Sequence, residues 1–357
     1  MTEPIRVGVI GFGLAGRIFH TAVIQATPGL ELAAVVQRSG DDAKKEYPEA
    51  RQARSIEELL ADPGIRLVVI ATPSYSHYEL AKQCLREQRN VVIDKPFTLK
   101  SEEAAELIRT ARHRKLLLTA YQNRRWDGHF RTLRSVIKGG ELGRLVSFES
   151  HFDRFRPAPR RDVWRESGGP GGGTLFDLGP HLIDEALTLF GAPDTITASV
   201  RVEREHAAVD DAWDILLEYE HPYRFTAALR ATLTACAPGP RYVVHGTKGS
   251  FTKWGFDPQE DQLKAGMRPD APGFGEEPES AWGELKLCSE SGPAIRRVKT
   301  ERGDYRGFYE NVRDVLLGNA ELEVKPEQAW RTTRLIELAR ESSGQGRRLK
   351  VDFSAQP

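Results

Sequence analysis

The stretch Gly11-Phe12-Gly13-Leu14-Ala15-Gly16 decides how the first third of this chain folds. It follows the apolar run 5–10 and precedes apolar residues at helical spacing, Ile18, Ala22 and Ile24. Three glycines at this spacing permit a tight turn, close approach of a diphosphate to the backbone and close packing of helix on strand. The free N–H groups at the start of the helix would bind the phosphates. Because the chain has 32 glycines, the pattern alone is weak, and its position between strand and helix predicts the dinucleotide site.

Short apolar runs alternate with helical stretches on either side of this turn, up to about residue 120. The runs, rich in Val, Ile and Leu, are 5–10, 30–36, 67–71, 91–93 and 116–120. Continuous apolar runs of this kind are typical of parallel strands covered on both faces. The pattern therefore predicts an α/β fold that begins with a dinucleotide-binding Rossmann domain, a doubly wound parallel sheet, over residues 1–122.

Beyond residue 122 the pattern changes to alternation of apolar and polar residues. It recurs in short runs at 146–153, 196–203, 214–219, 225–234 and 241–245. A helix is expected at 182–190, a long loop at 257–283 and a final helix from Pro326 to about 343. These features predict a C-terminal α+β domain, residues 123–357, with a large open, mostly antiparallel sheet. It would bind substrate and form oligomers, and its final helix can pack back on the N-terminal domain.

Composition excludes several classes of function. The 51 basic and 51 acidic residues cancel, so no basic field would attract nucleic acid or an anionic membrane. The chain shows no signal-peptide pattern and no apolar run of about 18 residues. Cys84, Cys236 and Cys288 are widely spaced, which favours a reducing cytoplasm over a disulfide framework. No metal-binding motif is present, and we expect no metal.

The residues that close the second strand bear on the choice of cofactor. An acidic residue there would bind the adenosine ribose and repel a 2′-phosphate. The chain has Gln37-Arg38-Ser39 instead, and a guanidinium with a hydroxyl suits a 2′-phosphate. We therefore expect NADP(H) to be favoured over NAD(H). The alternative is that Arg38 is a solvated loop cation and that Asp41 or Asp42 reaches the ribose.

Two patterns offer groups for proton transfer. Asp94-Lys95-Pro96 lies at the carboxyl end of a central strand, where such sheets bind ligands, and Lys95 could hydrogen-bond a reacting oxygen or be an ordinary strand-end lysine. Asp177 and His181 are four residues apart. If one helix contains both, the carboxylate could orient the imidazole as a general base. If Pro180 is instead the first helical position, the spacing proves less. Asp184, in the same stretch, is as consistent with a surface carboxylate as with a part of this site.

Two polar clusters suit a polyhydroxylated ligand, although each is equally consistent with a salt-bridged loop. One is Gln122-Asn123-Arg124-Arg125-Trp126, at the crossing between the domains. The other combines donors, acceptors and an aromatic face after the first strand of the second sheet: His151, Asp153, Arg154, Arg156, Arg160, Arg161 and Trp164. From these clusters we take Arg125, Asp153, Arg156 and Trp164 as candidate substrate-binding residues.

The order of these motifs resembles the Gfo/Idh/MocA oxidoreductase family over nearly the whole chain, and a subgroup that contains NADP-dependent scyllo-inositol dehydrogenases. The resemblance implies that Lys95 binds the substrate hydroxyl, that His181 is the general acid/base and that Asp177 acts at the same oxygens. It also implies that the cofactor is lined by Thr72, Pro73, His77 and Asn123, with Asp94 where the family usually has Glu. Assembly as a homodimer or homotetramer through the second-domain sheet is likewise implied.

Together these observations predict an NAD(P)-dependent dehydrogenase that interconverts a secondary alcohol and a ketone on a cyclic polyol or sugar. The main rival is a non-catalytic NADP-binding sensor of the same fold, which would have no use for Lys95, Asp177 and His181 together. A second rival is an enzyme that uses bound cofactor transiently in glycoside cleavage.

Overall fold

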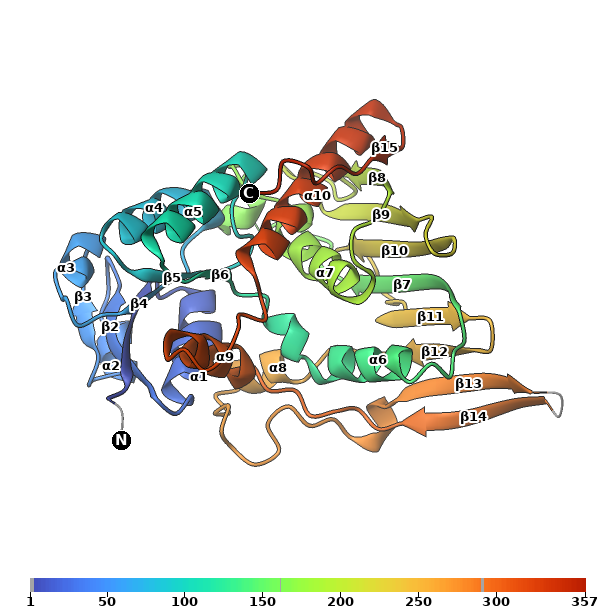
Figure 1. Ribbon diagram of the computed structural model, residues 1–357, viewed down its shortest axis with the longest axis horizontal. Coiled ribbons are helices and arrows are strands. Elements are labelled where there is room, and N and C mark those ends of the chain that lie inside the picture. The colour runs from blue at the N-terminus through green and yellow to red at the C-terminus, as the bar shows by residue number, and fades with distance from the viewer. Residues whose placement is uncertain (1–2, 161, 290–291) are drawn as a thin grey trace.

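The structure, a computed structural model, describes residues 3–160, 162–289 and 292–357 and contains one sheet in each half of the chain (Figure 1). Arg161, part of the second polar cluster, lies outside the described residues. The first sheet consists of six parallel strands in the order β3-β2-β1-β4-β5-β6. Its strands are β1 (Ile5–Ile10), β2 (Leu30–Val36), β3 (Arg51–Ala53), β4 (Leu67–Ile70), β5 (Asn90–Ile93) and β6 (Leu118–Ala120). This arrangement confirms the predicted doubly wound sheet.

Helical segments connect the strands of the first sheet. They are η1 (Ala15–Thr21), α1 (Ala22–Gln25), α2 (Asp42–Glu46), α3 (Ile56–Leu60), α4 (His77–Arg86) and α5 (Ser101–Arg114). The strand order reverses between β1 and β4, the point at which open parallel sheets bind ligands outside their carboxyl ends. β3 was not predicted because three residues, Arg-Gln-Ala, make no apolar run.

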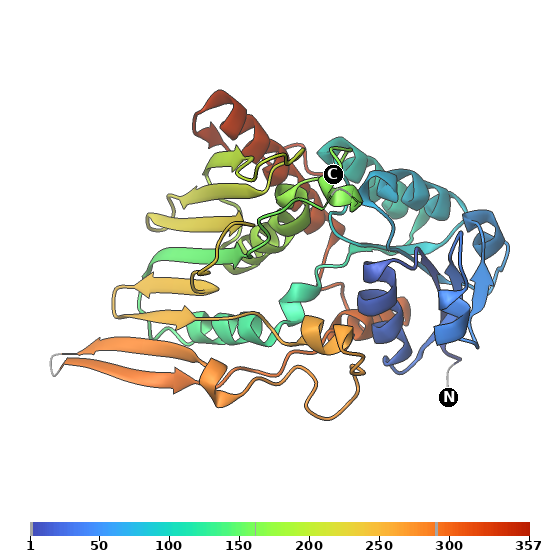
Figure 2. The same ribbon diagram turned by 180° about the vertical axis from the view of Figure 1, so that it is seen from behind.

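The second sheet has nine strands in the order β14-β13-β12-β11-β7-β10-β9-β8-β15. Its strands are β7 (Leu145–Asp153), β8 (Thr195–Arg201), β9 (Ala212–Tyr219), β10 (Phe225–Thr232), β11 (Tyr242–Gly246), β12 (Gly249–Lys253), β13 (Gly283–Ser289), β14 (Gly292–Val298) and β15 (Leu349–Lys350). All pairs are antiparallel except β7 with β10 in the middle, which confirms a mostly antiparallel sheet. In Figure 2 the β13–β14 hairpin extends beyond the rest of the molecule.

The helices of the second half differ in part from the prediction. They are α6 (Gly128–Lys138), α7 (Thr174–Phe190), α8 (Gln259–Lys264), α9 (Arg306–Leu316) and α10 (Pro326–Gln345). The helix expected at 182–190 begins at Thr174, so Pro180 lies inside it and Asp177 and His181 share it. The expected loop 257–283 contains α8 and the short turn η5 (Glu279–Ala281). We did not predict α6 and α9, although each has buried apolar residues at helical spacing, such as Phe130, Leu133 and Val136 in α6.

The final helix connects the two domains. α10 packs against β8 and α7 of the second half and against α5 of the first. At the contact with α5, the amide and the hydroxyl of Ser101 each donate to the carboxylate of Glu337, both at 2.7 Å. The chain therefore returns to its first domain after building the second. Among the described residues, no helix combines the length and the apolar character needed to cross a membrane.

Candidate active site

A cleft of about 970 Å³ lies between the two domains. The first domain lines it with the glycine turn after β1 and with the carboxyl ends of β2, β4 and β5. The second domain contributes the start of α7 and the segment that follows β7. Because the cleft includes the point where the strand order reverses, it is where the fold would bind a dinucleotide.

The glycine turn has the shape that a diphosphate requires. Gly11 has φ of +100°, a conformation that side chains rarely adopt, and a Cβ there would approach the carbonyl oxygen of Ala71 to 2.8 Å. A Cβ on Gly13 would meet nothing within 4 Å, so this backbone borders open space in the cleft. A Cβ on Gly16 would strike the Gly11 carbonyl, so Gly16 serves the packing of helix on strand rather than the cleft. The predicted cradle therefore fits a dinucleotide cofactor.

The end of β2 bears on the two alternatives for the adenosine side of the cleft. Arg38 and Ser39 line it, and Arg38 is exposed and makes no hydrogen bond or ion pair with a described residue. Asp41 instead pairs with Arg54, 2.6 Å from its guanidinium, and Asp42 accepts from the Gln37 amide at 3.1 Å. Neither carboxylate lines the cleft. Of Arg38, Asp41 and Asp42, only Arg38 lacks a side-chain partner among the described residues.

Most of the other predicted cofactor residues line the cleft, but one does not. Phe12, Leu14, Ala15, Thr72, Pro73, Asp94 and Asn123 all contribute to its surface. His77 is buried behind it, with its ring nitrogens 2.8 Å from the Pro96 carbonyl and 2.9 Å from the Thr72 carbonyl. The prediction that His77 lines the cofactor is corrected: it holds the two loops that do.

Lys95 and Asp177 meet across the domain boundary. The Lys95 ammonium donates to the Asp177 backbone carbonyl at 2.6 Å and to its carboxylate at 2.9 Å. Arg165 lies 3.3 Å from the same carboxylate oxygen. Burial alone would raise the pKa of Asp177, but the charges of Lys95 and Arg165 outweigh it and hold that pKa far below its usual range. Asp177 is therefore an anion that fixes the position of Lys95.

His181 lines the cleft one helical turn beyond Asp177. Its Nδ1 is buried and has no hydrogen-bond partner among the described residues. Burial lowers its pKa well below the ordinary 6.5, and the nearby cations, Lys95 first, lower it further. The expectation that Asp177 orients His181 is wrong, since that carboxylate contacts Lys95 and Arg165 instead. His181 is instead a neutral base beside an already paired lysine.

Two candidate substrate residues and one supposed surface carboxylate have other roles. Arg125 is buried and forms a two-pronged ion pair with Asp184, at 2.8 and 2.6 Å. Asp184 is therefore not a surface carboxylate, since its side chain is only 3% exposed. Asp153 accepts from the amide of Gly239 at 3.2 Å and does not line the cleft. Arg125 and Asp153 are corrected from substrate-binding to structural positions, because their polar groups are used within the protein.

Arg156 and Trp164 do line the cleft, together with residues that the sequence reasoning missed. Trp164 packs edge-on against Tyr75 of the first domain, with ring centres 6.0 Å apart, so aromatic side chains of both domains meet here. Arg165 lies 4.5 Å over the Trp164 ring and also pairs with Asp177. Its position next to Trp164 in the chain was the signal that could have identified it. Tyr75 and Tyr121, also in the lining, had no such signal.

Comparisons with known proteins match both domains to one family. A model described as "Oxidoreductase family, NAD-binding Rossmann fold" matches residues 5–122. A second, "Oxidoreductase family, C-terminal alpha/beta domain", matches residues 134–352. Both models carry the family name Gfo/Idh/MocA.

Individual relatives extend over almost the full length. The chain is 40% identical to an uncharacterised oxidoreductase of Escherichia coli, YdgJ, over 96% of this chain and 97% of that protein. It is 34% identical to a Bacillus subtilis protein named scyllo-inositol 2-dehydrogenase (NADP(+)) IolW, over 98% of this chain and 97% of that protein. The solved structure of the Bacillus subtilis oxidoreductase YvaA superposes on this chain with a TM-score of 0.94 at 34% identity. The match covers 98% of this chain and 99% of that structure. The chain therefore belongs to the Gfo/Idh/MocA family of NAD(P)-binding oxidoreductases.

Proposed function

We propose that this enzyme is an NADP(H)-linked dehydrogenase that interconverts a secondary alcohol and a ketone on a cyclic polyol or sugar. The observation that carries the proposal is the joint position of Lys95, Asp177 and His181 in one cleft with the glycine turn. A general base and a donor for the substrate oxygen are what oxidation of an alcohol requires.

In this proposal each side chain has a separate task. An ammonium has three N–H donors, and Asp177 accepts two of those of Lys95, which leaves one for the substrate oxygen. His181 is neutral at physiological pH and can take the hydroxyl proton as the C–O bond becomes a carbonyl. When bound, the nicotinamide ring would supply the acceptor for the hydride that leaves the substrate carbon. In the reverse direction, protonated His181 returns the proton to the oxygen.

Two observations support the finer parts of the proposal. Arg38, which has no partner among the described residues, and the Ser39 hydroxyl at the adenosine end favour a 2′-phosphate, whereas Asp41 and Asp42 are paired elsewhere. The name of the 34% identical relative, a scyllo-inositol 2-dehydrogenase (NADP(+)), favours a ring polyol and the same cofactor. Likeness of fold alone would not support a substrate class.

The test is a screen of inositols, hexoses and sugar acids with both cofactors, followed by the absorbance of reduced nicotinamide. We expect oxidation of at least one ring polyol, with kcat/KM higher for NADP than for NAD. Lys95→Met and His181→Asn should each lower kcat by about 10²–10⁴-fold. Their cofactor Kd should stay within about threefold of the unmodified enzyme.

Other results would contradict the proposal in distinct ways. Binding of NADP(H) without turnover of any alcohol or ketone would favour the sensor. Release of sugar without net cofactor reduction would favour glycoside cleavage. Loss of cofactor binding in both variants would show that Lys95 and His181 belong to the cofactor site alone.

Assembly and location complete the proposal. Leu216 of β9 is 37% exposed on the outer face of the second sheet, and we place the contact of a homodimer or homotetramer on that face. Light scattering of the enzyme and of Leu216→Asp tests this, since a lower mass is expected for the variant.

The free cysteines, among them the exposed Cys236 and Cys288, fit a reducing cytoplasm.

A further inference from the structure

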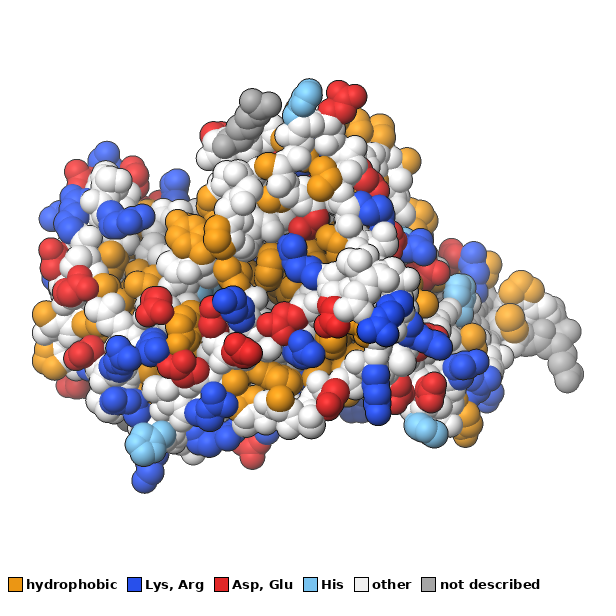
Figure 3. Space-filling model, turned by 90° about the horizontal axis from the view of Figure 1, so that it is seen from above, with side chains coloured by type: hydrophobic (Ala, Val, Ile, Leu, Met, Phe, Trp, Pro, Cys, Tyr) orange, Lys and Arg blue, Asp and Glu red, His pale blue; other side chains and the backbone are white. Residues whose placement is uncertain are grey.

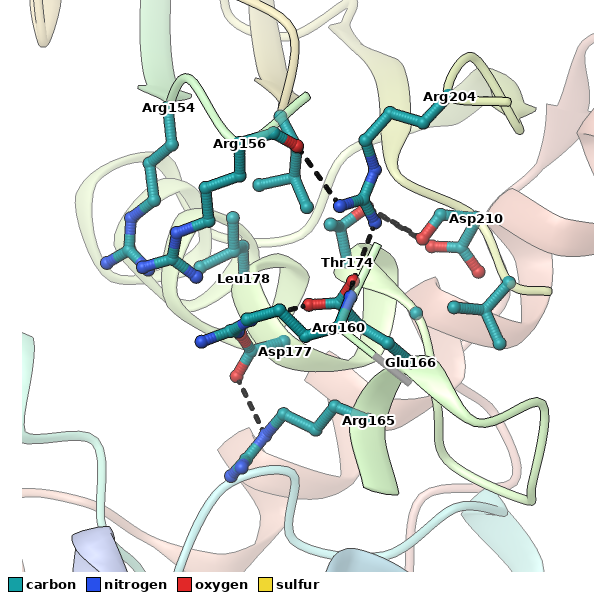
Figure 4. A pocket seen from close by; sticks show the side chains of 13 residues that line it. Arg154, Arg156, Arg160, Arg165, Glu166, Thr174, Asp177, Leu178, Arg204 and Asp210 are labelled. Carbon is teal, nitrogen blue, oxygen red and sulfur yellow. Dashed lines mark hydrogen bonds and ion pairs between the residues drawn. The ribbon is translucent and has the colours of Figure 1, made fainter. Parts of the chain in front are cut away.

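Arginines are concentrated at the end of the cleft that holds Asp177 and His181. Arg154, Arg156, Arg160 and Arg165 reach it from the chain that follows β7, and Figure 4 shows them around Asp177 and Thr174. Two of them have carboxylate partners. Arg160 pairs with Glu166 at 3.0 Å, and Arg165 lies 3.3 Å from Asp177.

Arg154 and Arg156 are not balanced in this way. Arg154 forms only a long ion pair with Glu260, at 3.9 Å, among the described residues. The same carboxylate is shared with two other cations, Arg124 at 2.9 Å and Lys264. The side chain of Arg156 makes no hydrogen bond or ion pair with any described residue. In Figure 4 the two guanidinium groups extend in the same direction, toward the cleft.

The two arginines line the same cleft as Lys95, Asp177 and His181, and their charges act on one another and on the last two of these groups. Burial lowers the pKa of Arg154, the charge of Glu260 opposes this in part, and the charge of Arg156 lowers the pKa further. The charge of Arg154 in turn helps to lower the pKa of both Asp177 and His181. These two like charges repel each other, and an anionic ligand that contacts both would reduce that cost.

We propose that Arg154 and Arg156 bind an anionic group, a carboxylate or a phosphate ester, on the substrate whose hydroxyl lies at Lys95 and His181. The inference rests on the proposed function and narrows it from sugars in general to acidic sugar or polyol derivatives. The cofactor's diphosphate does not account for these arginines, because its cradle is the glycine turn of the other domain. Guanidinium groups suit both anions, which accept two parallel hydrogen bonds from one fork.

The experiment compares matched neutral and anionic compounds on the full-length enzyme with NADP: D-glucose, D-glucuronate and D-glucose 6-phosphate. We expect kcat/KM to be at least about 10-fold higher for one anionic member than for glucose, and to fall as NaCl is raised. Which anion is favoured distinguishes carboxylate from phosphate. Arg156→Gln and Arg154→Gln should raise KM for that anion about 10- to 100-fold while leaving NADP affinity within about threefold.

Controls separate a specific loss from a general one. Arg134→Gln removes the same charge from an exposed position of α6 outside the cleft and should leave the preference for the anion unchanged. Arg156→Lys keeps the charge but loses the planar fork. Its KM for the anion should lie between those of the unmodified enzyme and of Arg156→Gln. Calorimetric binding of glucose and glucuronate to the NADPH-loaded enzyme measures the subsite without turnover.

The outcomes are distinguishable from failure of the proposed function. A preference for the neutral sugar, equal binding of both compounds, or equal effects of Arg156→Gln on neutral and anionic substrates would overturn the inference while leaving the dehydrogenase intact. Preferential binding of the anion without oxidation of any compound would support the subsite and contradict the proposed activity.

Discussion

Burial and neighbouring charge determine the protonation of the single residues in the cleft. Asp177 stays ionised because Lys95 and Arg165 surround it, although burial alone would favour its neutral form. His181 stays neutral because burial and nearby cations both disfavour its charged form. The anion and the neutral base on one helix therefore have opposite tasks: one positions a donor, and the other can accept a proton.

The first prediction concerns pH. Since the pKa of His181 lies well below 6.5, the base is unprotonated through the neutral range and loses activity only when pH falls to its lowered pKa. We expect kcat/KM for alcohol oxidation to remain level as pH falls through 6.5 and to decline only at lower pH, near the lowered pKa of His181. A pH profile from 5 to 9 measures this, and His181→Asn should lack that acidic limb. An acidic limb centred at or above 6.5 that disappears in the variant would contradict the assignment.

At the scale of elements, the turn between β1 and η1 is decided by backbone space rather than by side chains. Gly13 borders the open cleft, so an added methyl group would meet no protein atom within 4 Å but would occupy the place of a phosphate. Gly16 differs because an added methyl group would strike the protein itself. The three glycines of one motif therefore fail in different ways when substituted.

The second prediction follows from that difference. Gly13→Ala should fold with unchanged Tm but bind NADP(H) on the order of 10-fold or more weakly, a loss of about 1.4 kcal/mol. Fluorescence titration of NADPH and thermal unfolding check the two parts. Gly344→Ala, at an exposed helical glycine with nothing within 4 Å, is the matched control and should bind cofactor normally. Unchanged affinity in Gly13→Ala would contradict the cradle.

Two elements near the interdomain crossing are joined by the buried pair of Arg125 and Asp184. Arg125 lies in η3 (Asn123–Trp126), just after the Rossmann domain, and Asp184 lies in α7. Arg125 also donates to the carbonyl of Glu323 at 2.8 Å, before α10 begins. The pair thus fixes α7, which carries Asp177 and His181, against the segment that leads out of the first domain.

The third prediction tests this pair. Asp184→Ala leaves a buried guanidinium without its carboxylate and should lower the free energy of unfolding by about 3–5 kcal/mol. Urea denaturation measures the loss. The double variant Arg125→Met with Asp184→Leu removes both charges and should recover most of the stability. A single variant within about 1 kcal/mol of the unmodified protein would show that the pair contributes little.

At the scale of the whole molecule, the cofactor cleft depends on both domains and on the return of α10 to the first. Figure 3 shows basic and acidic side chains intermixed on the face it presents, in keeping with the zero net charge. The excess of positive charge is local, at Arg38 on one end of the cleft and at Arg154 and Arg156 on the other. Selectivity for charged ligands is therefore expected inside the cleft rather than over the surface.

The fourth prediction concerns stabilisation of the folded chain by its cofactor. A ligand at 100 times its Kd stabilises the state that binds it by about 2.7 kcal/mol. We expect NADPH to raise Tm more than NADH at equal concentration, and Arg38→Glu to reverse that order. Thermal unfolding measures both, with Arg134→Gln as the charge-matched control. An equal shift from the two cofactors in the unmodified enzyme would contradict the preference for NADP(H).

The sequence by itself determined the Rossmann sheet, the glycine cradle and the mostly antiparallel second sheet, because each depends on local periodicity or on residues adjacent in the chain. It also pointed to Lys95, Asp177 and His181, through their motifs. Only the tertiary structure decided that Asp177 pairs with Lys95 rather than with His181, since that contact spans 82 residues. In the same way it showed that Arg125 is structural and that the Arg156 side chain has no partner in the part of the chain that the structure describes, because the partner of a charged side chain is set by what the fold brings near it.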